Sequence, residues 1–175
     1  MENTLRLNLG CAKDIRSGFI NVDLHYKHPD VINEDISDLS FVENNTVSEI
    51  LAKDVIEHLP LEVSLNCLEK WFGWLKPGGV LWIQTTNFEK IKEAYEQKVW
   101  DLKVLNHMLF SGVNWIGGKS ENCDFHKSVY TLDFLTKELT KIGYKIIQSK
   151  IDEIDNSLIH DAYSHNLNLI IKAQK

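Results

Sequence analysis

The sequence predicts an α/β fold built on a mainly parallel sheet. Short apolar runs with the length of strands alternate with longer segments whose apolar residues recur at helical spacing. The first two runs, 5–9 and 20–23, are joined by a short turn, and the second ends in an acid, Asp23. The last two runs, 144–150 and 166–173, are joined by a polar connection without a helical pattern, which favours an antiparallel hairpin.

The other elements follow from periodicity and from residues that begin or end helices. Segment 61–75 carries one apolar stripe and stops at Pro77-Gly78. Segment 132–142 has Thr131 as its N-cap and is followed by a glycine. The expected strands are 5–9, 20–23, 31–33, 48–52, 80–85, 144–150 and 166–173, the expected helices are about 61–75, 88–99 and 132–142, and the stretch 101–130 is irregular.

The turn between the first two strands indicates the kind of ligand. In a parallel sheet the ligand lies outside the carboxyl ends of the strands, where Asp23 could accept hydrogen bonds from ribose hydroxyls. A dinucleotide site needs a glycine-rich turn, a full helix and an acid about 20 residues further on. Here Asp23 follows Gly10 by 13 positions, and the turn has neither further glycines nor the Lys-Ser/Thr pair of a phosphate loop. S-adenosylmethionine, which has a ribose and no phosphate, fits this spacing better than a dinucleotide.

Four motifs then occur in a specific order. They are Leu5 to Ala12 followed by Asp23, the acidic Asp35-Ile36-Ser37-Asp38, the strand and loop Ile50 to Leu59 ending in Glu57-His58-Leu59, and Leu75-Lys76-Pro77-Gly78-Gly79. Together they resemble the class I SAM-dependent methyltransferases, in particular small stand-alone members with the Glu-His-Leu and Leu-Lys-Pro-Gly-Gly signatures. The resemblance spans Leu5 to about Ala173. It implies one domain over 1–175 with a Rossmann-like seven-stranded sheet, helices on both faces, a shortened first helix and an antiparallel last strand.

The resemblance also implies a cofactor site for S-adenosyl-L-methionine and its product S-adenosyl-L-homocysteine. Gly10 would let the backbone approach the methionyl part of the cofactor, and Asp23 would hold the ribose. Asp35 would accept from the adenine amino group, or it caps a loop or helix. The implied cofactor residues are Leu9, Gly10, Cys11, Ala12, Asp23, Asp35, Ile36, Lys53 and Asp54. Ala12 departs from the family pattern, which has a second glycine at this position.

Two histidines are candidates for catalysis. Methyl transfer to a hydroxyl needs a base, and His126 is the first candidate and His58 the second. The segment 101–130 that contains His126 is rich in aromatic residues and is expected to be an acceptor-binding loop or lid. The alternatives are that this segment covers an apolar cluster, and that Glu57 and His58 tie the loop to a helix N-terminus.

Other residues allow weaker alternatives. His25 and His28, with Asp23 and Asp30 nearby, have a loosely ligand-like spacing, but they lack the pattern of a recognisable site, so no metal is expected. Cys11 could be a nucleophile, or simply a small side chain that fits the cofactor turn. Cys11, Cys67 and Cys123 are odd in number and far apart, which suits reduced thiols in the cytoplasm.

The composition limits the partners. A net charge of −6 without a basic patch argues against nucleic acid. The chain begins without a secretory signal, and no apolar run reaches the roughly 18 residues of a membrane span. We therefore expect a cytoplasmic protein whose partner is a small-molecule or sugar acceptor, with no membrane contact and with a homodimer left open.

These observations favour SAM-dependent methyl transfer to oxygen or nitrogen of a small molecule or glycan precursor. The alternative is a non-catalytic SAM-binding regulatory or interaction module, because Ala12 replaces a glycine and no residue is unmistakably catalytic. A nucleotide-dependent oxidoreductase is a third hypothesis, and the short spacing from Gly10 to Asp23 argues against it.

Overall fold

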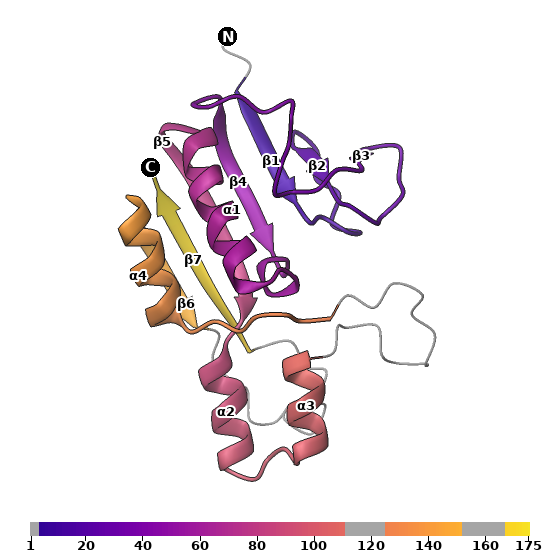
Figure 1. The fold of residues 1–175 in the computed structure, drawn as a ribbon, viewed down its shortest axis with the longest axis vertical. Helices are drawn as coiled ribbons and strands as arrows, with labels where there is room; N and C mark the ends of the chain where they lie inside the picture. The colour runs from indigo at the N-terminus through magenta and orange to yellow at the C-terminus, as the bar shows by residue number, and fades with distance from the viewer. Residues whose placement is uncertain (1–3, 111–124, 152–166) are drawn as a thin grey trace.

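The computed structural model describes residues 4–110, 125–151 and 167–175 (Figure 1). They form one seven-stranded sheet in the order β3-β2-β1-β4-β5-β7-β6. The strands are β1 (Leu5–Leu9), β2 (Ile20–Val22), β3 (Val31–Ile32), β4 (Val47–Lys53), β5 (Leu75–Thr86), β6 (Lys145–Ile151) and β7 (Asn168–Gln174). β7 runs antiparallel to β5 and β6, and β1 to β5 pair in parallel. The predicted mainly parallel sheet with an antiparallel last strand is confirmed.

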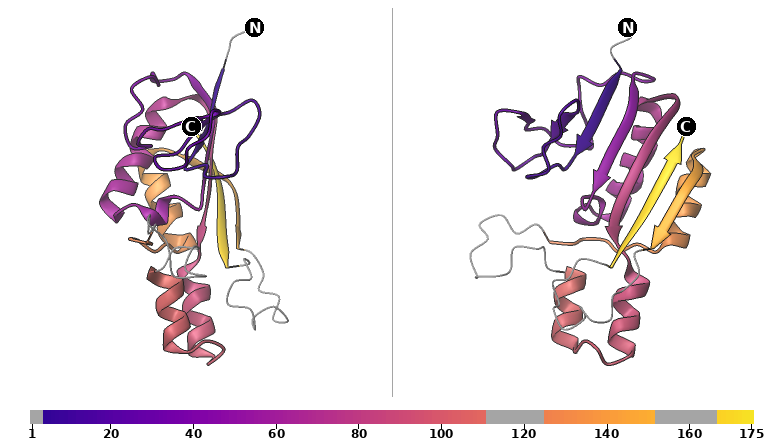
Figure 2. Two further views of the ribbon diagram at one scale, coloured as in Figure 1. Left: turned by 90° about the vertical axis from the view of Figure 1, so that its right-hand side faces the viewer. Right: turned by 180° about the vertical axis from the view of Figure 1, so that it is seen from behind.

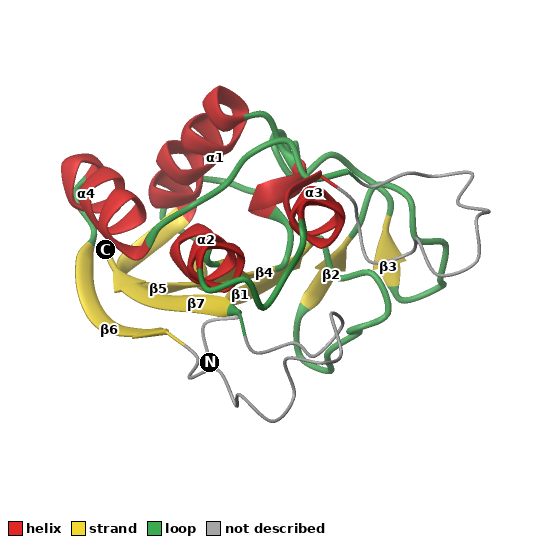
Figure 3. Cartoon of the chain, turned by 90° about the horizontal axis from the view of Figure 1, so that it is seen from below, coloured by secondary structure: helices red, strands yellow, loops and turns green. Residues whose placement is uncertain are grey.

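The described helices cover one side of this sheet. They are the 3₁₀ turn η1 (Ile56–His58), α1 (Leu61–Trp74), α2 (Phe88–Glu96), α3 (Leu102–Phe110) and α4 (Leu132–Ile142). α1 and α4 pack on the same face, and α2 and α3 extend beyond the carboxyl end of β5 (Figures 1 and 2). Seen along the strands, all four α-helices lie on one side (Figure 3). Helices were expected on both faces, and among the described residues they occur on one.

The connection from β1 to β2 contains no helix. Residues 10–19 form turns, whereas a shortened helix was expected there. These ten residues must pass from the end of one parallel strand to the start of the next, and a polar network described below holds them in place. Because this connection is short, no described residue forms a helix over β1 and β2 on the face of the sheet opposite α1.

The strand β5 begins earlier than predicted. α1 ends at Trp74, and Leu75 already pairs with Val47 of β4. The register then shifts, so that Glu49 pairs with Val80, and Pro77-Gly78 lies within this bulge instead of preceding the strand. Gly78 has a φ of +79°. Pro77-Gly78 was predicted to stop the helix, and in the structure Gly78 allows the backbone of the bulge to bend.

The core lies between the sheet and the pair α1 and α4. Every second residue of the central strands is buried there, as the period of two predicts. The fully buried side chains include Leu7, Leu9, Ile50, Leu81, Ile83, Leu169, Leu68, Trp71, Leu135 and Leu139. A second cluster joins α2 and α3 through Ile91, Ala94, Trp100, Val104 and Met108. α3 lies in the stretch expected to be irregular, and residues 111–124 of that stretch lie outside the described residues.

The opposite face of the sheet carries a groove of about 370 Å³. Its lining includes Asn8, Leu51, Trp82, Gln84 and Ile170, the alternate residues of the same strands. All of the predicted cofactor residues are described. Lys53, at the end of β4, is the one predicted cofactor residue that the groove lining includes. Among the described residues, no helix has the length and apolar character to span a membrane.

Candidate functional site

Gly10 lies at the carboxyl end of β1 in a conformation that few other residues adopt. Its φ is +64°, and a Cβ built on it would lie 2.2 Å from Cγ2 of Val55. Val55 follows β4 and leads into η1. The turn after β1 and the turn after β4 are thus in direct contact, at the edge of the sheet where ligands of parallel sheets bind.

Asp23 lies at the end of β2 and holds this turn in place. Its Oδ2 accepts from the amide of Ala12 at 2.9 Å, and its Oδ1 accepts from the amides of His25 and Tyr26 at 2.9 and 2.8 Å. A carboxylate has about four acceptor sites, so about one remains for a ligand. The predicted proximity of Gly10, Ala12 and Asp23 is present, and the predicted ribose contact stays a prediction.

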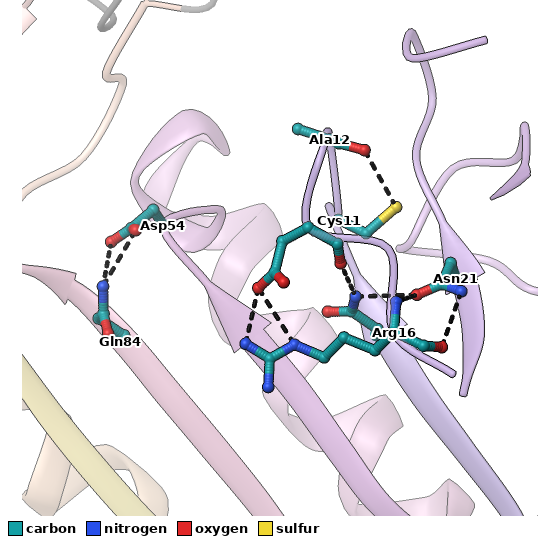
Figure 4. A network of polar contacts seen from close by, with 8 residues as sticks. Cys11, Ala12, Arg16, Asn21, Asp54 and Gln84 are labelled. Carbon is teal, nitrogen blue, oxygen red and sulfur yellow. Dashed lines mark hydrogen bonds and ion pairs between the residues drawn. The ribbon is translucent and has the colours of Figure 1, made fainter. Parts of the chain in front are cut away.

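A polar network takes the place of the missing helix. Asn21 is buried in β2, and its Oδ1 accepts from Asn8 Nδ2 at 3.0 Å and from the Arg16 amide at 2.9 Å (Figure 4). The Arg16 guanidinium pairs with Asp14 at 2.7 Å. Sequence reasoning missed the two asparagines. The available signal was an asparagine at the same paired register in two adjacent apolar strands.

Cys11 is buried beside the turn and shares no disulfide. Burial, followed by the negative charge of Asp23, raises the pKa of its thiol to about 11. A thiol with this pKa is protonated near neutral pH, and the thiolate is the nucleophilic form. The structure therefore favours the small-side-chain alternative over the nucleophile.

Asp35 and Ile36 lie in the turns after β3. Oδ1 of Asp35, an exposed residue, accepts from the Ser37 amide at 2.8 Å, which is a loop-capping contact. Ile36 is buried, and its carbonyl accepts from the Trp71 indole at 3.3 Å. The capping alternative for Asp35 is present, and the adenine contact of both residues stays a prediction.

Lys53 and Asp54 end β4. Lys53 is exposed. Asp54 has a φ of +51°, its amide donates to the Gln84 carbonyl at 2.8 Å, and its carboxylate accepts from Gln84 Nε2 at 3.0 and 3.2 Å (Figure 4). Leu9 ends β1 with a fully buried side chain, so its backbone is the part that can face a ligand.

A second cluster lies just beyond this edge and contains both predicted catalytic histidines. The rings of His58 and His126 meet edge to face, with centroids 4.9 Å apart. One side-chain ligand atom from each of Glu57, His58 and His126 lies within 4.8 Å of the others. Glu57 is 1% exposed, and its Oε2 has no hydrogen-bond partner in the part of the chain that the structure describes. The structure thus brings together residues that sequence reasoning named separately.

The segment 125–130 runs along η1 and positions His126. The amides of Lys127 and Ser128 donate to the Glu57 carbonyl at 2.7 and 3.2 Å. The Ser128 hydroxyl lies 2.8 Å from Oη of Tyr130, which shares a 2.6 Å hydrogen bond with Ser64 of α1. Tyr130 is 1% exposed. A buried hydroxyl network therefore fixes this part of the 101–130 segment against η1 and α1.

Burial also changes the acidity of Glu57. It raises the pKa of the carboxyl to about 7, in spite of a backbone hydrogen bond and the nearby His58, which act in the opposite direction. Asp54 adds to the increase. Strongly shifted groups gather at functional sites, which makes this cluster a site candidate on electrostatic grounds as well.

The weaker metal alternative is not supported by the geometry. His28 lies 3.8 Å from Asp30 in the loop after β2, while Asp23 is engaged with backbone amides. Among the residues that the structure describes, Glu57, His58 and His126 are the group whose ligand atoms come together.

Comparison with known proteins adds the fold relationship. No model of a protein family matches the sequence, and no curated protein matches it. A SAM-dependent methyltransferase from Methanosarcina mazei aligns over 100% of this chain and 93% of its own, with a TM-score of 0.68 and 16% identity. One from Archaeoglobus fulgidus aligns over 99% and 87%, with a TM-score of 0.63 and 14% identity.

The small RNA methyltransferase HEN1 aligns over 98% of this chain and 23% of its own, with a TM-score of 0.61 and 15% identity. At such identities the similarity establishes the architecture. The strand order, the antiparallel β7 and the near-complete coverage agree with it. This chain has the fold of the class I SAM-dependent methyltransferases.

Proposed function

We propose that the protein transfers a methyl group from S-adenosylmethionine to an oxygen or nitrogen of a small molecule or glycan precursor. One observation carries this proposal: the contact between Gly10 and Val55 joins the cofactor turn to the loop that bears Glu57 and His58. A methyl donor held by the first and an acceptor facing the second would be adjacent. Methyl transfer is an in-line displacement, so this adjacency is what the reaction requires.

The cofactor side is assigned to the carboxyl ends of β1, β2 and β4. The backbone from Leu9 to Ala12 would surround the methionyl part, and the remaining acceptor site of Asp23 would bind the ribose. Asp35 and the Ile36 amide would meet the adenine, and Lys53 and Asp54 would complete the site. S-adenosylmethionine supplies the activated methyl group, and these residues bind and orient it.

The acceptor side is assigned to the second cluster. His126 would remove the proton of a hydroxyl acceptor, with His58 as the second candidate. His58 follows Glu57 directly in the sequence, and the segment that carries His126 is hydrogen-bonded to the Glu57 carbonyl. The rest of the 101–130 segment is proposed to bind the acceptor.

The acceptor class rests on charge. The structural relative HEN1 is a small RNA methyltransferase. This chain has a net charge of −6, which favours a small or sugar-like acceptor over a polyanion. The described cysteines Cys11 and Cys67 are free thiols, which fits a reducing compartment such as the cytoplasm.

A specific observation also favours the non-catalytic SAM-binding module as a second candidate. Ala12 occupies the second glycine position with a φ of +42°, and Asp23 already accepts three backbone hydrogen bonds. Both features leave less room for tight cofactor binding. A module of this kind would bind the cofactor and transfer no methyl group.

Thermal-shift measurements with S-adenosylmethionine, S-adenosylhomocysteine, NAD and ATP test the cofactor assignment. A ligand at a hundredfold excess over its Kd stabilises the native state by about 2.7 kcal/mol. We expect a shift with the two adenosyl compounds and none with NAD. The absence of any shift at millimolar S-adenosylhomocysteine would refute the proposal. Binding without methyl transfer across a panel of hydroxyl and amine acceptors would select the module.

A further inference from the structure

We propose that Glu57, His58 and His126 form a binding site for a divalent transition-metal cation. The three side chains come from η1 and from the segment 125–130, and a ligand atom of each lies within 4.8 Å of the others. Two imidazoles and one carboxylate are the donor set of known zinc and iron sites with open coordination positions. This is a property of the cluster itself and does not rest on methyl transfer.

The burial of Glu57 supports a cation more than a purely structural role. Glu57 is 1% exposed and its Oε2 has no hydrogen-bond partner among the described residues, although the Thr85 side chain lies near it. Buried carboxylates are normally paired or bound to a metal. A cation held by the cluster would pair this buried carboxylate.

Closing the site needs only side-chain movement. Ligand atoms around an ion with bonds of about 2.1 Å are separated by roughly 3.0–3.4 Å, so ligand atoms 4.8 Å apart must approach by about 1.4–1.8 Å. The backbone that carries it is fixed: the amides of Lys127 and Ser128 bind the Glu57 carbonyl, and the Ser128 hydroxyl lies 3.0 Å from the Leu59 carbonyl. Rotation of the two imidazoles can therefore complete the site on a rigid frame.

The open positions of such a site would face the proposed acceptor. A hydroxyl bound to a divalent cation loses its proton to water more readily, and the resulting alkoxide would accept the methyl group. This consequence, unlike cation binding, rests on the proposed function. A ring nitrogen that binds a cation cannot also accept a proton, so a bound cation would replace His126 as the means of activating the acceptor.

Titration of the tag-free, chelator-treated protein with Co²⁺ tests the site. We expect about one Co²⁺ per chain, with a visible absorption band from nitrogen and oxygen ligation, and competition by Zn²⁺ or Mn²⁺. His126→Ala and His58→Ala should each weaken binding by more than about tenfold. His25→Ala, which changes a histidine outside the cluster, should leave binding unchanged.

Binding of S-adenosylhomocysteine to every variant reports that the fold is intact and tests the cofactor assignment separately. Failure to bind Co²⁺, Zn²⁺ and Mn²⁺ would overturn the cation site and leave His126 as the proposed base. Equal affinity in wild type and His126→Ala would overturn it as well. If the wild type binds Co²⁺ but does not bind S-adenosylhomocysteine, the proposed function is refuted and the cation site is retained.

Discussion

Val55 Cγ2 lies 2.2 Å from the place where the Cβ of any residue other than glycine at position 10 would be. Two carbon atoms that are not bonded to each other do not come this close. The contact joins the end of β1 to the end of β4, and the sequence distance between the two positions gives no indication of it. It also makes Gly10 the position where substitution has the clearest structural consequence.

Gly10→Ala should therefore destabilise the protein by about 2–5 kcal/mol, the sum of a left-handed backbone and an overpacked contact. Gly18→Ala is the matched control. Gly18 has a φ of +77°, and a Cβ built on it would lie 3.7 Å from the nearest atom, Nη1 of the flexible Arg6 side chain. Its substitution should therefore cost only the free energy of the left-handed backbone, about 1–2 kcal/mol. Urea unfolding of both variants gives the difference. Equal losses would show that Val55 moves aside freely.

Asp23→Asn should weaken binding of S-adenosylhomocysteine by about 1.5–3 kcal/mol, because a charged acceptor for the ribose is lost. The remaining amide oxygen can still accept some of the backbone hydrogen bonds that hold the turn. Calorimetry measures the affinity. Asp30→Asn, an exposed acid in the neighbouring loop, should leave it unchanged. An affinity for Asp23→Asn equal to that of the wild type would show that this carboxylate does not contact the cofactor.

The Cys11 thiol should react slowly with iodoacetamide at pH 7–9, since its pKa is raised from 9.0 to about 11 by burial and by Asp23. Raising the pKa of an acid keeps it protonated in the folded state. The thiol therefore disfavours folding as the pH rises from 9 toward 11, where the unfolded chain ionises first. Mass spectrometry of the Cys11 peptide follows the rate. Rapid alkylation at pH 7 would restore the nucleophile hypothesis.

His126→Ala should lower turnover of a hydroxyl acceptor by about 10²–10⁴ if the imidazole acts as the base, while the affinity for S-adenosylhomocysteine stays close to wild type. His28→Ala, in the loop between β2 and β3 and outside both the cluster and the 101–130 segment, is the control. Methyl transfer from labelled S-adenosylmethionine gives the rates. Turnover equal to that of the wild type would remove His126 from the reaction.

Tyr130→Phe should cost about 1–3 kcal/mol of stability, because Ser64 and Ser128 lose a buried partner. It should also weaken Co²⁺ binding and slow turnover, since the segment that carries His126 loosens. Tyr144→Phe is the matched control: its buried hydroxyl binds only the Leu68 carbonyl, on α1 and away from the cluster. Stability should fall in both, and function only in Tyr130→Phe. An equal functional loss in both would show a general effect of reduced stability.

Most of the sheet could be predicted from the sequence because burial on one face leaves a period of two. Leu7 and Leu9, or Leu81 and Ile83, record that burial directly. α3 was missed because its apolar residues pack on α2 instead of on the main core, inside a stretch that reads as irregular. The face of the sheet without a described helix was not predicted, because the absence of a helix from residues 10–19 leaves no pattern in the sequence.

The candidate site was predictable where local backbone chemistry decides it. Gly10 and Ala12 follow β1 and Asp23 follows its parallel neighbour β2, so their proximity follows from the pairing of the two strands. The approach of His126 to His58 depends on Tyr130 and Ser128 binding η1 and α1, which are tertiary contacts. Sequence could name both histidines and could not place them together.

The central place of β7 in the sheet has a consequence for synthesis of the chain. β7 lies between β5 and β6, and its residue Gln174 pairs with both Val80 and Lys145. Both neighbours are translated first and remain without their shared partner until residues 168–174 leave the ribosome. A nascent chain halted before that point would expose two unpaired strand edges, the kind of surface that recruits chaperones or aggregates.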